Sequence, residues 1–352
     1  MTPSLALSVL DLVPVRSDQT TSDALAASVS LARVADQSGF RRYWLAEHHN
    51  MPAVAATSPP LLISLVAGST ERIRVGSGGV MLPNHAPLVV AEQFALLEAA
   101  YPGRVDLGIG RAPGSDPVTN WALRHGGGGL GDSPDEAVAR FPEYVDNVLA
   151  MMDTVGVGLD IGGRRHPLRA TPHAVSRPPV WLLGSSGYSA SLAAAKGLPY
   201  VFAHHFSGRG TAEALALYRD GFVASDQAAE PITFLTVNAV VAPTRVQAER
   251  LALPQLQAMV ALRTGGELRP QSLVEDAEAA GVPADHRALL AAMAERWVID
   301  DPAGAATRIA DLAVEHGVDE VMVHLVAGAL TGTDPARSPA REETLRLLAA
   351  AL

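Results

Sequence analysis

The sequence contains no cysteine, and this absence excludes several kinds of chemistry at once. Disulfide bridges, thiolate metal sites and a cysteine nucleophile are all impossible in such a chain. Lysine is almost absent too, because Lys196 is the single lysine among 27 basic residues. Together with abundant alanine, glycine and proline, this scarcity is typical of a GC-rich coding sequence, which bears on the source of the protein and not on its chemistry.

Basic charge is also in short supply, since 27 basic residues face 37 acidic ones and the formal charge is −10. Nucleic acids and anionic membranes are bound by basic faces, so neither is an expected partner. No apolar run reaches the roughly 18 residues of a membrane span, and no basic segment of a signal peptide precedes the first apolar run. We therefore expect a soluble, cytoplasmic protein with a large core, to which 48% hydrophobic residues contribute.

Apolar, strand-like runs are plentiful, and helical patterns separate them. The expected strands cover residues 5–12, 43–47, 73–82, 105–110, 180–183, 200–205, 232–241 and 320–325. Eight such units predict an α/β fold, namely a (β/α)8 TIM barrel, which typically needs about 250 residues plus insertions. A doubly wound open sheet is the alternative, but no glycine-rich phosphate loop follows the first strand.

No change in composition divides the chain, so we expect residues 1–352 to form a single domain. Two insertions interrupt the regular alternation. The first covers about residues 112–140, includes the four glycines at 126–129, and is expected to be a mobile lid over the site. The second is helical, covers about residues 243–300, and is expected to help build the substrate pocket, although no motif marks its residues.

Polar residues gather where the expected strands end, and in a barrel these ends share the face that carries the chemistry. In chain order the ends offer Asp11, Glu47-His48-His49, Asn84-His85, Arg111, Ser185-Ser186, His204-His205, Asn238 and His324. Neighbouring side chains on a strand point to opposite faces, which makes His48 a better candidate for the site than His49. This density of titratable groups indicates an enzyme.

Several of these residues also have a plainer interpretation. Glu47 could pair with a buried arginine such as Arg41 or Arg42, and His204-His205 could be a satisfied surface pair. Asp106 lies inside a strand, where a structural hydrogen-bonding role is more common than a catalytic one. Tyr43 and Trp44 read best as packing residues.

The turn Gly184–Ser189 has the composition of a phosphate site, because small residues before a helix expose backbone N–H groups and the positive end of the helix dipole. An ordinary helix cap has the same composition. Arg111 favours the phosphate interpretation, since it ends the preceding barrel strand and would lie beside this turn. A second unusual segment is Gly76–Gly79, where glycines inside a strand indicate a bulge or the close approach of a flat cofactor ring.

The sequence resembles the bacterial luciferase-like flavin-dependent monooxygenases in three segments: Tyr43–His49, Val80–Pro87 and Gly103–Arg111. The string Trp181–Ser186, followed by Gly197–Pro199, is similar to the fifth strand, helix and sixth strand of that family. The resemblance runs in order through about the first 240 residues, and the end of the chain near residues 319–326 fits loosely.

The resemblance implies an FMN-dependent monooxygenase in which reduced FMN, supplied by a separate flavin reductase, reacts with O2 to form a flavin hydroperoxide that oxygenates an organic substrate. His48 and Glu47 would be catalytic, and Gly78-Gly79 would form a bulge, often with a cis peptide bond, under the isoalloxazine ring. The residues implied at the FMN phosphate are Arg111, Ser185, Ser186, Gly187, Tyr188 and Ser189. We expect no metal ion in the site. We expect the protein to form a homodimer.

The sequence departs from the family pattern in two places. Gly110 replaces a cysteine of the luciferase catalytic subunit, and Ser185 replaces an acid beside the phosphate-binding serine. The second change bears on phosphate affinity and on which flavin binds. The GC-rich coding bias favours a tailoring step in secondary metabolism, such as polyketide hydroxylation or epoxidation, although the sequence does not name the substrate.

Three other functions stay open. A deazaflavin-dependent oxidoreductase shares the fold and transfers hydride, but its poly-glutamate coenzyme tail favours a basic groove. A metal-dependent barrel hydrolase usually has His-x-His after the first strand, where this chain has Leu10-Asp11-Leu12. A non-catalytic flavin-binding subunit would not need both His48 and the phosphate cluster.

Overall fold

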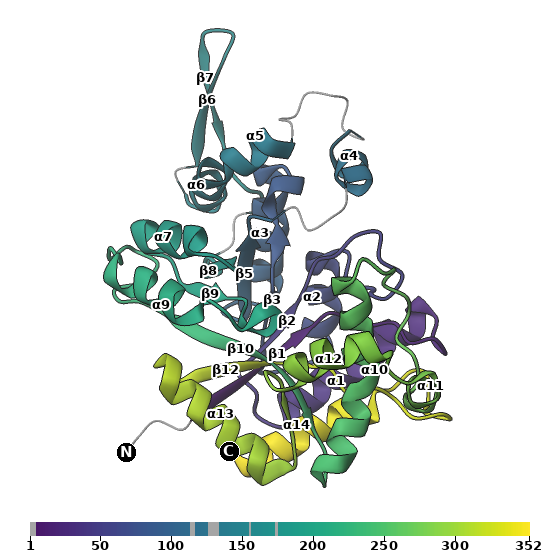
Figure 1. The fold of residues 1–352 in the computed structure, drawn as a ribbon. Helices are drawn as coiled ribbons and strands as arrows, with labels where there is room; N and C mark the ends of the chain where they lie inside the picture. The colour runs from purple at the N-terminus through teal and green to yellow at the C-terminus, as the bar shows by residue number, and fades with distance from the viewer. Residues whose placement is uncertain (1–4, 113–116, 126–133, 155, 173–174) are drawn as a thin grey trace.

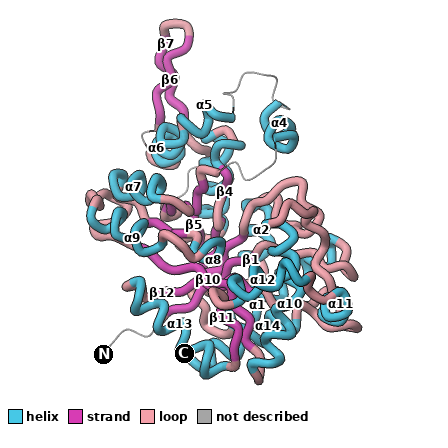
Figure 2. Tube along the Cα trace, in the orientation of Figure 1, coloured by secondary structure: helices cyan, strands magenta, loops and turns pink. Residues whose placement is uncertain are grey.

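The chain folds around a closed barrel of eight parallel strands, which confirms the predicted (β/α)8 TIM barrel (Figures 1 and 2). The computed structural model describes residues 5–112, 117–125, 134–154, 156–172 and 175–352. Each strand pairs with the next around the ring, and the last pairs with the first. In ring order the strands are β1 (Ala6–Asp11), β2 (Arg42–Leu45), β3 (Arg74–Ser77), β5 (Val105–Gly110), β8 (Val180–Gly184), β9 (Tyr200–Phe202), β10 (Thr233–Val241) and β12 (Glu320–Leu325).

Each barrel strand is followed by a helix that covers the outside of the sheet (Figure 1). These helices are α1 (Thr21–Gln37), α2 (Pro59–Ala67), α3 (Pro87–Ala100), α6 (Phe141–Met151), α7 (Gly187–Lys196), α9 (Thr211–Asp220), α13 (Pro302–His316) and α14 (Pro339–Ala351). Local signals set several of their limits: a capping box between Thr20 and Asp23 begins α1, and Gly39 follows it with a φ of 81°. The main hydrophobic core lies between these helices and the outer face of the barrel.

The remaining elements interrupt this pattern. They are β4 (Val80–Met81), η1 (Leu82–Asn84), α4 (Pro117–His125), α5 (Pro134–Ala139), β6 (Val157–Ile161), β7 (Arg164–Leu168), α8 (His204–Ser207), α10 (Arg245–Arg263), α11 (Val274–Ala280), η2 (Ala284–His286), α12 (Arg287–Ala294) and β11 (Val298–Asp300). The second insertion is helical, as predicted, but it ends in β11, which adds to the barrel sheet beside β10. In the first insertion, α4 and α5 are described, whereas the four glycines at 126–129 lie outside the described residues.

The antiparallel hairpin of β6 and β7 was not predicted, and it projects away from the barrel (Figure 1). Its turn is Gly162-Gly163, with φ angles of 59° and 77°. Two consecutive positive φ angles are the requirement of a type I′ turn, which glycine meets without steric cost. Among the described residues, no helix is long and apolar enough to cross a membrane.

Alternate residues of the strands point into the barrel and stack in layers, as the pleat of a strand requires. At the N-terminal ends of the strands, charged residues form the bottom layer: Arg42, Arg74, Asp106 and Glu320. The next layer is aromatic, because Trp44, Trp181 and Phe234 pack with ring centroids 5.1 to 5.6 Å apart. Polar and small residues occupy the C-terminal ends above it, where the barrel opens.

Candidate active site

A cavity of about 590 Å³ opens at the C-terminal ends of the barrel strands, directly above the aromatic layer. Most of the predicted site residues line it: Glu47, His48, Gly78, Gly79, Arg111, Ser185, Ser186 and Ser189. Gly187 and Tyr188 lie just behind this wall, in the first turn of α7. Strand ends that are far apart in the sequence therefore meet around one cavity, as the barrel topology predicts.

The glycines of the third strand form a bulge. Between paired positions the chain takes four steps from Gly76 to Val80, while the partner strand takes three from Asp106 to Ile109. The Gly78–Gly79 peptide bond is cis, as the family resemblance implies. A Cβ on Gly78 would lie 2.7 Å from Leu10 Cδ1, and one on Gly79 would lie 2.9 Å from a backbone oxygen. Close packing in the barrel therefore favours glycine at both positions, in addition to their exposure to the cavity.

One corner of the cavity is suited to an anion. Helix α7 begins here, and its N-cap Ser186 makes no hydrogen bond through its side chain to the first turn. The hydroxyls of Ser185 and Ser186 and the first backbone N–H groups are therefore available at the positive end of the helix. Arg111 lies beside this turn, as predicted, with its guanidinium carbon 4.2 Å from the centroid of the Tyr188 ring. This corner offers charge and hydrogen-bond donors together, which is what a phosphate needs.

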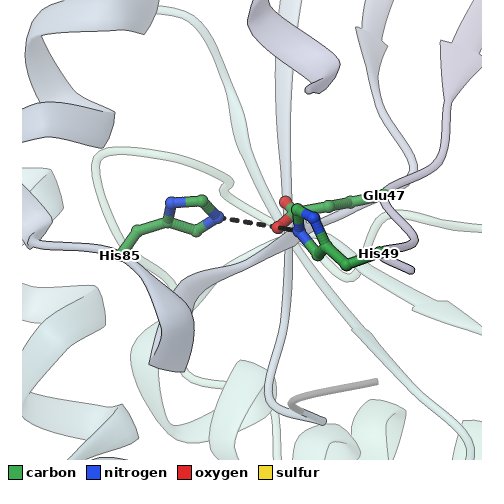
Figure 3. A group of neighbouring side chains, drawn as sticks. All are labelled: Glu47, His49 and His85. Atoms are coloured by element: carbon green, nitrogen blue, oxygen red, sulfur yellow. Dashed lines mark hydrogen bonds and ion pairs between the residues drawn. The ribbon is translucent and has the colours of Figure 1, made fainter. Parts of the chain in front are cut away.

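Glu47 is a buried residue of the cavity wall, where it joins two histidines (Figure 3). Its Oε1 lies 2.8 Å from His49 Nε2 and 2.7 Å from His85 Nε2, and its Oε2 accepts the Met81 N–H. Burial alone would raise the pKa of Glu47, but these hydrogen bonds and the charge of His85 lower it to about 2. Glu47 is therefore ionised at neutral pH, and it fixes the orientation of both rings.

The same three side chains could hold a metal ion, since one ligand atom of each lies within 4.8 Å of the others. Two imidazoles and a carboxylate are ligands that divalent transition metals accept. Their present geometry is that of hydrogen bonds, at 2.7 and 2.8 Å, which explains their orientation without an ion.

A second group of histidines lines the cavity itself. His48 is half-buried, and its buried Nδ1 has no hydrogen-bond partner among the described residues. His205 Nδ1 lies 2.8 Å from Thr236 Oγ1, and His324 Nδ1 lies 2.8 Å from Asn238 Oδ1. Burial lowers the pKa of all three, to about 4 for His205 and well below the ordinary value for His324. The three imidazoles are therefore neutral at pH 7.

Several sequence-based interpretations need correction. Glu47 does not pair with Arg41 or Arg42, because both arginines reach Glu320 at the other end of the barrel. Asp11 does not face the site: its carboxylate points outward, 2.6 Å from Arg341 and hydrogen bonded to Tyr43. Leu10 in β1 and Leu12 just after it line the cavity instead, and Asp11 ties the barrel to α14.

The remaining polar and aromatic residues of the strands take distinct roles. Asp106 is structural, since it accepts hydrogen bonds from Arg42, Arg74 and Trp44. Tyr43 and Trp44 are fully buried, as expected for packing residues. His204 and His205 are not a surface pair, because both line the cavity. His49 and His85 contact Glu47 rather than the cavity.

The insertion between β10 and β12 supplies one side of the cavity, as expected for about residues 243–300, but sequence reasoning named none of its residues. This side comprises Gln255, Ala258, Met259, Leu262, Arg263, Leu268, Arg269, Gln271, Met293, Arg296 and Trp297. No motif marks these residues. Thr236, the partner of His205, was also missed, although its inward position follows from alternation along β10 once Asn238 is known to face the site.

Comparison with known proteins identifies the family of this chain. The model of the family described as "Luciferase-like monooxygenase" matches residues 6–320. The chain belongs to the luciferase-like monooxygenase family. An Escherichia coli (strain K12) protein named luciferase-like monooxygenase is 38% identical over 327 residues, which is 91% of each chain. The uncharacterized protein YvbT of Bacillus subtilis (strain 168) is 40% identical over 318 residues, or 90% of each.

Solved structures agree with this family membership. The crystal structure of apo-MsnO8 superposes with a TM-score of 0.83 at 32% identity and covers 99% of this chain and 98% of its own. More distant structures, at 16% identity, share the fold alone; they include an oxygenating subunit of 3,6-diketocamphane monooxygenase in complex with FMN and a coenzyme F420-dependent reductase. This luciferase-like chain is thus an oxidoreductase of a fold that holds both FMN and F420.

The residues of the cavity fit a flavin mononucleotide. The corner at Arg111 and α7 offers donors for a phosphate, and the cis peptide of Gly78-Gly79 presents flat backbone to the cavity without side chains. The buried Nδ1 of His48, which has no partner among the described residues, leaves one polar atom for a ligand to satisfy.

Proposed function

We propose that this luciferase-like protein is a two-component monooxygenase, which takes reduced FMN from a separate reductase and uses O2 to oxygenate an organic substrate. The observation that supports it is the combination of three features in one cavity. These are the anion corner at Arg111, the side-chain-free backbone of Gly78-Gly79, and the buried Nδ1 of His48, which lacks a partner among the described residues. Reduced FMN would supply the electrons that activate O2.

The chain's own residues then have separable roles. Arg111 and the serine hydroxyls of Ser185, Ser186 and Ser189, together with the N–H groups of the α7 first turn, would hold the phosphate. The backbone of Gly78 and Gly79 would support the ring. The apolar layer of Trp44 and Met322 closes the floor of the cavity against water.

His48 would handle the proton. Its pKa is lowered by burial, so the imidazole is neutral at pH 7 and able to accept or return a proton at Nδ1. Glu47 is ionised and hydrogen bonded to His49 and His85. It would act beside His48 by placing a negative charge next to it and by fixing the positions of these two rings.

We also infer a homodimer. Helices α2 and α3 pack side by side on the barrel and carry large apolar side chains that face outward. Leu61 and Leu96 are 69% and 56% exposed, and Leu65 and Val89 are also exposed. Such a patch marks an association surface more often than an isolated apolar residue does. Sedimentation analysis should find a dimer, and the Leu61→Glu, Leu96→Glu double variant should shift it to a monomer.

Anaerobic titration with reduced FMN, followed by rapid mixing with O2, tests the proposed activity. We expect saturable binding and then a transient absorbance band that differs from the bands of reduced and oxidised FMN. In the His48→Ala variant the band should be lost or shortened at least tenfold in lifetime while binding persists. His166→Ala, on the exposed hairpin strand β7, is the matched control and should behave as wild type.

Hydride transfer, flavin carriage and metal chemistry would each give a different result. Binding of reduced coenzyme F420 in preference to reduced FMN, with no oxygen-dependent band, would replace the proposal with hydride transfer. Reduced FMN binding without any such band would indicate a flavin carrier. If neither coenzyme binds, the proposal is wrong, and metal analysis of Glu47, His49 and His85 becomes the next measurement.

A further inference from the structure

The charge of the cavity is opposite to that of the chain. The whole sequence carries a formal charge of −10, yet four arginines and a single carboxylate are found among the described residues that line the cavity. The carboxylate is Glu47, which already holds two histidines. Arg111 is assigned to the phosphate corner. The other three, Arg263, Arg269 and Arg296, all come from the insertion between β10 and β12.

Arg296 follows α12 and makes no hydrogen bond or ion pair with any residue that the structure describes. It is only partly exposed, and its aliphatic stem fills the space beside Gly208, where a Cβ would lie 3.1 Å from Arg296 Cδ. The stem thus packs beside Gly208, while the guanidinium, which carries five donors, has no acceptor among the described residues. A cavity-lining arginine without an acceptor is suited to an anionic ligand.

Arg263 adds a second positive charge at the same place. It ends α10, donates from Nη2 to the Phe206 backbone oxygen at 2.6 Å, and pairs with no described carboxylate. Burial, followed by the charges of Arg263 and Arg209, lowers the pKa of Arg296, so these cations lie close enough to repel one another. Arg269 differs, because it is mostly exposed and bonds Glu267 at 3.2 Å. Among the described arginines on this side of the cavity, Arg263 and Arg296 are the two that pair with no described carboxylate.

Apolar residues adjoin this pair on the same side of the cavity. Met259, Leu262, Met293 and Trp297 come from the same insertion and line the cavity with the two arginines. The opposite wall carries His48 and Gly78-Gly79, where the reaction is proposed to occur. A ligand that fits both features has an apolar body and one anionic head.

From this arrangement we infer that the substrate is an apolar organic acid, such as a carboxylate or sulfonate, whose head group pairs with Arg263 and Arg296 while its body extends toward His48. This inference rests on the proposed function, because it assumes that the flavin occupies the corner at Arg111. The two arginines would then decide specificity by charge, and the insertion would decide it by length and shape.

Calorimetric binding of matched probes tests the inference. Decanoate and decanesulfonate have the proposed head group, and decanamide has the same chain without the charge. Wild type, with and without bound FMN, should bind decanoate at least tenfold more tightly than decanamide. Arg296→Gln and Arg263→Gln should each reduce this ratio at least fivefold, and Arg296→Lys should restore part of it. Arg245→Gln makes the same change at the exposed start of α10, outside the cavity, and should leave the ratio unchanged.

The outcomes separate this inference from the proposed function. If reduced FMN binds but decanoate and decanamide bind equally, the substrate assignment is wrong and the monooxygenase proposal stands. If reduced FMN does not bind, the proposed function fails first. If the two arginines instead govern binding of F420 with its poly-glutamate tail, but not of decanoate, then the anion they recognise belongs to a coenzyme, and the substrate assignment is again wrong. Circular dichroism melts of each variant show whether it is folded.

Discussion

The two ends of the barrel differ in how they treat charge. At the N-terminal end, Asp106 accepts hydrogen bonds from Arg42, Arg74 and Trp44, and Glu320 accepts them from Arg41, Arg42 and Ser8. At the C-terminal end, His48 Nδ1 and the guanidinium of Arg296 have no partner among the described residues.

This difference separates stability from chemistry within one barrel. Buried charges at the bottom are compensated by neighbours in the same chain, so their arrangement needs no ligand. Uncompensated groups at the top lower stability unless something else satisfies them, and a binding site is where a protein tolerates that. The aromatic layer of Trp44, Trp181 and Phe234 separates these two groups of residues.

The largest effect is expected from breaking the bottom network. Asp106→Ala would leave Arg42 with Glu320 alone and Arg74 with no carboxylate among the described residues, and removing one member of a buried pair costs about 3–5 kcal/mol. Chemical denaturation should detect this loss in the free energy of unfolding. Glu143→Ala, which breaks the exposed pair with Arg140, should cost less than about 1 kcal/mol. Equal losses in both variants would contradict the comparison.

At the top, the corresponding change should cost affinity rather than stability. Arg111→Gln removes a charged donor from the anion corner, and hydrogen bonds to charged groups contribute about 1.5–3 kcal/mol. Reduced FMN should therefore bind about 10- to 150-fold more weakly, as measured by anaerobic fluorescence titration. The melting temperature should stay close to wild type. A large loss of stability with unchanged FMN affinity would mean that Arg111 belongs to the structural class.

Acid should affect the top of the barrel before the bottom. The pKa of His205 is about 4 in the folded chain because of burial, against an ordinary value of about 6.5. The unfolded chain therefore binds more protons between these two values, and the free energy of unfolding falls as pH decreases through this window. From pH 7 to pH 5, His205 alone should cost about 2 kcal/mol.

Denaturation at several pH values checks this expectation through the slope rather than the absolute stability. His205→Gln should flatten the pH dependence between 6.5 and 4, whereas His166→Gln, on the exposed hairpin, should retain the wild-type slope. Glu47 is an acid rather than a base, and it affects stability over a lower pH range. Its contribution is complete above about pH 4.5 and is lost toward pH 2, the value of its folded pKa.

The sequence was sufficient for the barrel because its strands and helices follow local patterns. Helix α3 begins at Pro87, and proline is favoured at a first helical position, while every barrel strand overlaps an expected apolar run. The order of the strands then brings their polar ends together, which is why His48, Arg111 and Ser186 could be assigned to one cavity. The hairpin was missed although Gly162-Gly163 carries the signal of a type I′ turn.

The orientation and partners of single side chains were harder to predict. Strands buried on both faces do not reveal which face points inward, so Asp11 was placed in the site although it pairs with Arg341 outside the barrel. Glu47 meets His85, 38 positions away, through a contact that depends on the bulge and η1. Arg263 and Arg296 reach the cavity through the packing of α10 and α12, which leaves no short motif.

The smallest expected effect concerns Tyr188, which supports Arg111 without lining the cavity. Its ring lies 4.2 Å from the guanidinium carbon and is 42% exposed, and an exposed contact of this kind contributes about 0.5–1 kcal/mol. Tyr188→Leu should therefore weaken reduced FMN binding by about two- to fivefold. Reduced riboflavin, which lacks the phosphate, should bind wild type and variant equally. The ratio of the two affinities isolates the anion corner, because any general change in the cavity alters both flavins alike. An equal loss for both would show that Tyr188 shapes the cavity rather than the charge at its edge.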